Sequence, residues 1–151
     1  MATKYNGSPR EMRALDAFIK LMRASSSVGG RLYGQLAREE GLTESQLGVL
    51  EALHHLGSMS QGELCGKLLK SGSNLTTVID NLERDGLVRR ERDAEDRRVQ
   101  NVHLTEEGRR VIRRVFPGHV QRIVDAMSAL SADEQQELGR LCRKLGTAQQ
   151  S

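Results

Sequence analysis

The chain has 151 residues, of which 37% are hydrophobic, and a formal net charge of +3. With two Phe, two Tyr and no Trp, the core must consist of aliphatic side chains, which favours an elongated helical protein over a compact aromatic-rich enzyme. The length corresponds to one domain with helical extensions. The small charge excess does not by itself indicate nucleic acid. No apolar run approaches the roughly 18 residues that cross a membrane, so we expect a cytoplasmic protein.

The first segments of the chain predict a tail followed by a long helix. Residues 1–9 are polar and contain Gly and Pro, which indicates a mobile tail. Over residues 10–40, apolar side chains recur at the spacing of one helix face. Residues 25–30 are small and weakly helical, so the helix either bends there or lets another segment pack closely.

Two capping boxes predict the next two helices. Thr43 with Gln46, and Ser60 with Glu63, have the spacing in which a hydroxyl and a long polar side chain cap the same helix start. A third helix follows, ends at Gly86 and carries an apolar stripe. The stripe consists of Leu75, Val78, Ile79 and Leu82.

After Gly86 the apolar period changes from that of a helix to that of strands. Residues 87–92 and 99–104 predict two short strands, joined by a charged hairpin tip. Two further helices follow, capped by Thr105 and by Ser131. The predicted fold class is therefore mainly α with a small β-hairpin: a winged helix-turn-helix with helices on both sides.

In this arrangement the third helix is the one that enters the major groove of DNA. Near its start lie short hydrogen-bonding side chains, where backbone N–H groups also favour phosphate. These candidate DNA-binding residues are Ser71, Ser73, Asn74, Thr76 and Thr77. The alternative is that they only cap and solvate the helix.

A family resemblance is carried by the stretch SGSNLTTVIDNLERDGLVRRERDAEDRRVQNVHLTEEG. It resembles the recognition helix and wing of the MarR family of transcriptional regulators. An Asp and an Arg two apart, an apolar-rich strand and Leu-Thr-x-x-Gly are matched by Asp96, Arg98, Leu104, Thr105 and Gly108. The resemblance extends from about residue 12 to residue 146.

The resemblance implies roles for three residues of the hairpin. Arg98 is expected to enter the minor groove and Arg97 to lie close to phosphate. Asp96 is expected to orient an arginine through a charge-assisted hydrogen bond. The alternative is a solvated charged turn, since Glu95 and Asp96 partly neutralise the arginines.

The resemblance also implies the domain organisation and the partners. Residues 41–104 would be the DNA-binding domain, and residues 10–40 and 105–147 would form a homodimerisation domain. A dimer binds double-stranded DNA at a pseudo-palindrome with half-sites about one helical turn apart. We expect a regulator that is a repressor; the alternative is a winged-helix module for protein association without DNA binding.

Many members of this family release DNA when a small aromatic or phenolic effector binds between the two domains. The residues expected at that junction are Met22, Ser26, Arg31, Leu32, Leu50 and His54. Arg31 or His54 would hold an anionic or phenolic oxygen in an otherwise apolar pocket. The alternative makes Arg31 a surface ion-pair partner and His54 a satisfied helix-end residue.

Other chemistry is not indicated. The four histidines do not reproduce a metal-ligand pattern, and no catalytic cluster or phosphate loop stands out, so we expect no enzyme, no metal and no cofactor. Cys65 and Cys142 follow no redox or metal spacing. We expect both to be reduced, buried thiols.

Overall fold

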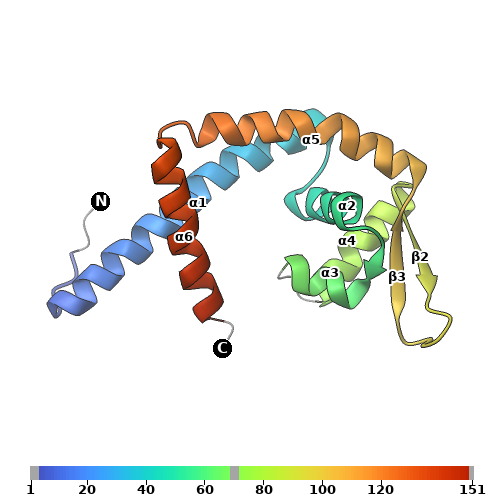
Figure 1. Cartoon of the computed structure of the whole chain (residues 1–151), viewed down its shortest axis with the longest axis horizontal. Helices are drawn as coiled ribbons and strands as arrows, with labels where there is room; N and C mark the ends of the chain where they lie inside the picture. Colours follow the sequence, from blue (N-terminus) through green and yellow to red (C-terminus); the bar gives the residue numbers. More distant parts are fainter. Residues whose placement is uncertain (1–3, 69–71, 150–151) are drawn as a thin grey trace.

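The computed structural model describes residues 4–68 and 72–149 (Figure 1). The chain is mainly helical with one small antiparallel sheet, as predicted. The elements are α1 (Pro9–Glu40), α2 (Glu44–Leu56), β1 (Met59–Ser60), α3 (Gln61–Leu68), α4 (Gly72–Arg84), β2 (Val88–Arg92), β3 (Gln100–Leu104), α5 (Glu106–Ala126) and α6 (Ala132–Ala148). None of the helices within the described ranges combines the length and the apolar character needed to cross a membrane.

Helix α1 starts at Pro9, one residue before the predicted start, and is continuous. Ser8 accepts a hydrogen bond from the backbone of Glu11, whose carboxylate accepts one from Ser8, and Pro9 opens the helix. The predicted tail is therefore too long, because a proline in the first turn needs no N–H partner. The helix continues unbroken through residues 25–30. Gly29 faces only Tyr33 and Gly30 faces nothing within 4 Å, so no other segment of the described chain packs there.

The sheet contains a strand that the sequence did not predict. Its order is β1-β3-β2, and β1 consists of only two residues, with Met59 opposite Val102. Two residues are too few to show the alternation that indicates a strand. Through β1 the start of α3 is joined to the hairpin, which we call the wing (residues 88–104).

The hydrophobic core lies within the winged part of the molecule. Helices α2, α3 and α4, the sheet, the end of α1 and the start of α5 surround one aliphatic cluster. The largest fully buried side chains are Leu36, Leu50, Leu64, Leu75, Ile79, Leu82, Ile112, Val49, Val88 and Val102. The predicted stripe of α4 therefore faces this core, and only its Val78 is partly exposed.

The opposite end of the molecule has an apolar surface that this chain leaves exposed. We call residues 9–31 and 120–148 the arm; in Figure 1 it extends away from the winged part. Helix α6 has no buried residue. The exposed large apolar side chains of the arm are Met12, Phe18, Leu21, Met22, Val120, Ile123, Val124, Leu138, Leu141 and Leu145. Cys142 is also exposed and Cys65 is half-buried, so the expectation that both are buried is wrong for this chain.

The wing and α5 meet at an unusually close crossing. Thr105 donates its hydroxyl to the carbonyl of Gly86 (2.7 Å) and its backbone N–H to the carbonyl of Leu87 (3.1 Å). The Thr105 hydroxyl also accepts from the N–H of Gly108 (3.0 Å). A Cβ at position 108 would lie 2.0 Å from the Leu87 oxygen. This position therefore requires glycine for space, since van der Waals contact needs more than 3 Å.

We expect Gly108→Ala to lower the free energy of unfolding by about 1–3 kcal/mol, because the methyl group must displace the backbone of Leu87, just before β2, rather than a flexible side chain. Urea unfolding followed by circular dichroism measures the loss. Gly118→Ala on the same helix is the matched control, because a Cβ there meets nothing within 4 Å. The control should leave stability unchanged or raise it by roughly 0.5–1 kcal/mol through helix propensity. If the two variants were equally stable, the close contact between Gly108 and the Leu87 carbonyl would be contradicted.

Candidate functional site

Helix α4 has one face in the core and the other in solvent. Asn74 and Thr77 are exposed, whereas Thr76 is half-buried. Thr76 accepts a hydrogen bond from the side chain of Gln61 (2.7 Å), which joins α3 to α4. Of the other predicted residues, Ser71 lies outside the described residues, and Ser73 belongs to α4 but its side chain is likewise outside them. Gln61 was not identified from sequence.

The tip of the wing is organised by one aspartate. The carboxylate of Asp93 accepts from the side chain of Asn101 and from the backbone N–H of Asp96, both at 3.1 Å. The backbone N–H of Asp93 donates to the carbonyl of Val99 (3.0 Å), and the N–H of Val99 donates to the carbonyl of Asp96 (3.0 Å). The tip therefore has a defined conformation before any partner binds, and binding need not order it.

Asp96 pairs with Arg98 through a two-pronged contact. Arg98 donates its Nε and its Nη2 to the two carboxylate oxygens, each at 3.1 Å, and its backbone N–H donates at 3.1 Å. The guanidinium lowers the pKa of Asp96, so the carboxylate is charged at neutral pH. The Arg98 side chain is nevertheless 91% exposed. Among the described residues Arg98 forms no other ion pair, so its remaining N–H donors are available to an anionic partner.

Arg97 is also exposed, at the same tip. Its carbonyl accepts a hydrogen bond from Nη1 of Arg92 (3.2 Å), which stabilises the backbone around it. The structure thus places Asp96, Arg97 and Arg98 together at the end of the hairpin, with two guanidinium groups in solvent. This arrangement is suited to phosphate or to the electronegative minor groove.

An arginine of β2 fixes the wing to α4. The backbone N–H of Arg90 donates to Glu83 (2.8 Å), and its guanidinium donates to Glu83 (3.1 Å) and to Asp80. The Arg90 side chain is only 22% exposed. The backbone N–H and then the guanidinium lower the pKa of Glu83, and partial burial opposes them. These bonds hold the wing in one orientation relative to α4, a role that the sequence did not reveal.

The six residues predicted to line an effector pocket do not come together. Leu50 is fully buried in the core and Met22 is 49% exposed on the arm. Arg31 and Leu32 line one shallow hollow, beside Arg122, and Ser26 and His54 do not line it. The physical reason is helix phase: successive turns of α1 and α2 direct these side chains to different surroundings.

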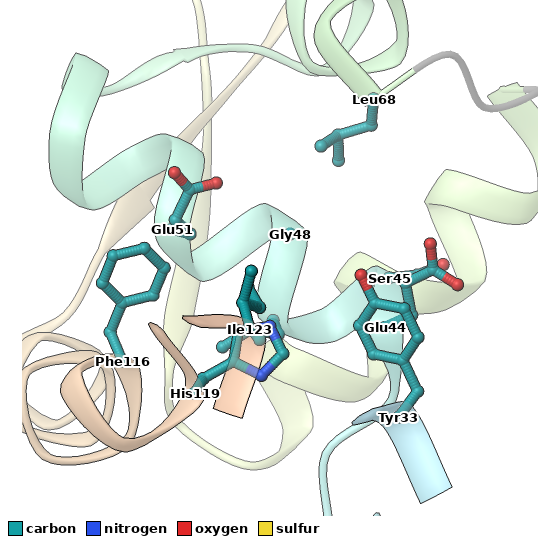
Figure 2. Close-up of a pocket in the computed structure, with 10 residues that line it drawn as sticks. Tyr33, Glu44, Ser45, Gly48, Glu51, Leu68, Phe116, His119 and Ile123 are labelled. Carbon is teal, nitrogen blue, oxygen red and sulfur yellow. The ribbon is translucent and has the colours of Figure 1, made fainter. Parts of the chain in front are cut away.

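A different hollow, of about 360 Å³, lies where α2 faces α1 and α5 (Figure 2). It is lined by Tyr33, Glu44, Ser45, Leu47, Gly48, Glu51, Leu68, Phe116, His119 and Ile123. His119 is 4% exposed, and its Nδ1 has no hydrogen-bond partner among the residues that the structure describes. Although the hollow contains two glutamates and a histidine, no three His, Cys, Asp or Glu side chains within residues 4–68 and 72–149 are grouped as metal ligands.

We expect Glu83→Gln to lower the free energy of unfolding by roughly 1 kcal/mol at pH 7, because a charge-assisted pair becomes neutral at a partly exposed site. The pKa of Glu83 is lower in the folded chain. Its contribution is therefore present above the unfolded pKa and is lost as the pH falls through the folded pKa. Chemical unfolding at pH 7 and below pH 4 measures this, with Glu95→Gln in the exposed tip as control. If the difference in unfolding free energy between Glu83→Gln and wild type stayed the same in acid, the charged pair of Glu83 and Arg90 would not be its cause.

Comparison with known proteins identifies the family. The model of the MarR family matches residues 42–99. The chain is 36% identical over 134 residues to YkoM of Bacillus subtilis, an uncharacterized HTH-type transcriptional regulator, covering 89% of this chain and 86% of YkoM. The fold is similar to Sco3205, a MarR family regulator of Streptomyces coelicolor solved in complex with DNA (TM-score 0.87, 28% identity, 98% and 93% of the two chains). It is also similar to BpsR of Bordetella bronchiseptica, whose DNA binding is regulated by 6-hydroxynicotinic acid (TM-score 0.79, 25% identity, 87% and 98%). The chain therefore belongs to the MarR family of winged helix-turn-helix transcriptional regulators.

Proposed function

We propose that the protein is a cytoplasmic, homodimeric repressor that binds a pseudo-palindromic operator and releases it when an effector binds. The observation that carries this proposal is the wing tip, where Arg98 is held by Asp96 yet is 91% exposed. A guanidinium that is pre-oriented but not covered loses little entropy when it enters a minor groove. The DNA complex of Sco3205 supports this use of the fold.

The exposed residues near the start of α4 read the major groove in this proposal. A groove about 12 Å wide admits a helix, and an amide such as that of Asn74 forms paired hydrogen bonds with adenine. Thr77 is also exposed, whereas Thr76 is half-buried. Asn74 and Thr77 are thus the candidates for base contacts, while Arg97 and Arg98 serve the backbone and the minor groove.

The exposed apolar side chains of the arm support the proposal of a homodimer. The arm exposes large apolar side chains on α1, α5 and α6, and contiguous exposed apolar patches mark interaction surfaces. A second copy covers such a surface with the same residues, because a two-fold interface is self-complementary. The two winged parts then face successive half-sites of the operator, and the bound dimer represses by covering promoter DNA.

The hollow of Figure 2 supports the proposal that an effector regulates DNA binding. It lies between α2, which packs in the winged part, and α5, which continues into the arm. A molecule bound there changes how these two helices pack and so changes the spacing of the two α4 helices. Regulation of BpsR by 6-hydroxynicotinic acid supports an effector with an aromatic ring; only the ring is carried over to this chain, since the BpsR molecule is itself a carboxylic acid. The hollow of Figure 2 replaces the six residues expected from sequence as the proposed site.

We expect Arg98→Ala to cost roughly 1–3 kcal/mol of operator affinity and to reduce the salt slope by about one phosphate-equivalent per wing. Asn74→Ala should instead relax sequence preference with little change in the salt slope, because a neutral amide releases no counterions. Fluorescence anisotropy on operator and random duplexes, at several salt concentrations, measures both. The duplexes come from the DNA upstream of the gene.

Each of these two variants is the control for the other. Neither residue lies in the core cluster, so both should keep wild-type helicity and oligomeric state. If Arg98→Ala binds the operator as tightly as wild type at every salt concentration, the hairpin is not a DNA-binding wing.

We expect Leu141→Asp to weaken the dimer by about a hundredfold or more, because each protomer then fails to bury a leucine worth roughly 1.5–3 kcal/mol. Removing residues 128–151 should have a larger effect. The winged part should stay folded in both cases, since α6 contributes no buried residue to it. Sedimentation velocity reports the oligomeric state, and Gln136→Asp, about half a turn away from the leucines, is the control. A truncated chain that remains a dimer would exclude α6 from the interface.

A further inference from the structure

The hollow of Figure 2 has acidic groups along one wall. Glu44, Gly48 and Glu51 follow one another on the same face of α2, at a spacing of four and three residues. Seven residues of helix place the two glutamates roughly 10 Å apart along the axis. Among described residues Glu44 forms no ion pair, and Glu51 has His55 Nδ1 at 3.5 Å. None of the ten described lining residues is Lys or Arg.

The two other titratable groups in the hollow do not offset this charge. Burial, followed by the nearby Arg122, lowers the pKa of His119, so its imidazole is neutral at pH 7. Burial, followed by Glu44, raises the pKa of Tyr33, so its phenol keeps its proton. Arg122 itself is paired with Glu39 outside the hollow. The formal charge of the lining therefore comes from two carboxylates alone.

The rest of the hollow is suited to a flat ring. Tyr33 and His119 have ring centroids 5.9 Å apart, and Phe116 lies on the α5 side. Leu47, Leu68 and Ile123 add aliphatic contact. A Cβ at Gly48 would lie 3.3 Å from Leu68, so glycine leaves the floor open. A volume of about 360 Å³ suits a small aromatic ligand, and aromatic faces attract cations.

We infer that the hollow binds a small aromatic molecule that carries a positive charge, such as an aromatic amine, and disfavours aromatic carboxylates and phenolates. The cationic group would lie toward Glu44 or Glu51, and the ring would lie against Tyr33 and Phe116. This inference deepens the proposed effector regulation and rests on it. It replaces the anionic or phenolic ligand expected from sequence, which depended on Arg31 and His54; neither lines this hollow.

Three probes of the same shape and different charge test the inference on the full chain. They are 2-naphthylmethylammonium, 2-naphthylmethanol and 2-naphthoate, titrated by calorimetry at pH 7. We expect the cation to bind at least about tenfold more tightly than the carboxylate, with the alcohol between them. Glu44→Gln and Glu51→Gln should each weaken binding of the cation by about two- to fivefold and should leave binding of the alcohol unchanged.

Glu106→Gln, at an exposed position at the start of α5, is the control and should leave all three affinities unchanged. The inference is overturned if 2-naphthoate binds as tightly as the cation, if no probe binds, or if both glutamate variants bind the cation like wild type. None of these results bears on the operator affinity of the unliganded protein. The proposed function would instead be contradicted if the unliganded wild-type chain failed to bind its operator.

Discussion

The close contact between the start of α5 and the backbone of Leu87, just before β2, is the constraint on which the arrangement of the molecule depends. Helix α5 belongs to both parts: its first turns pack on the core, and its last turns belong to the arm. Where it starts, the Gly108 backbone lies against the Leu87 carbonyl, and Thr105 joins the helix cap to the end of α4. The direction of the arm relative to α4 and the wing is therefore set by backbone contacts, which have little freedom to adapt.

The aliphatic composition has different consequences at the two ends of the chain. In the winged part, leucine and valine side chains from five helices and a sheet fill one core without any tryptophan. In the arm, side chains of the same kind are exposed, because α6 and the first turns of α1 bury none of them among the described residues. Apolar area left in water is costly to hydrate, and this cost favours the proposed homodimer.

Charged side chains have three different roles in this protein. Arg90 satisfies two carboxylates of α4 and so fixes the wing to the helix. Arg98 pairs with Asp96, while the outer N–H groups of its guanidinium remain in solvent. In the hollow, Glu44 and Glu51 face a neutral imidazole and a neutral phenol. The first pair stabilises the fold; in our proposals the second presents a cation to DNA and the third selects the charge of the effector.

The sequence by itself determined most of the elements. The capping boxes at Thr43 and Ser131 mark helix starts, because a hydroxyl and a carboxylate or amide three residues later recognise local backbone. The apolar period located α4 and the two longer strands, and the order of elements identified the winged fold. Asp96, Arg97 and Arg98 of the wing tip were predicted as a set from the resemblance to the MarR family, and they lie together because they are also neighbours in sequence.

Only the tertiary structure decided what depends on distant contacts. The two residues of β1 gain their strand character from pairing with β3, which lies 41 positions away for Ser60 and Asn101. Two residues are too few to show the alternation that indicates a strand. Arg90 meets Asp80 and Glu83 because the chain reverses after α4. The hollow combines residues of α1, α2, α3 and α5, so its lining and its acidic charge differ from the set chosen by helix position. Side-chain direction on each helix is fixed by how the helices pack, and no single segment of sequence contains that information.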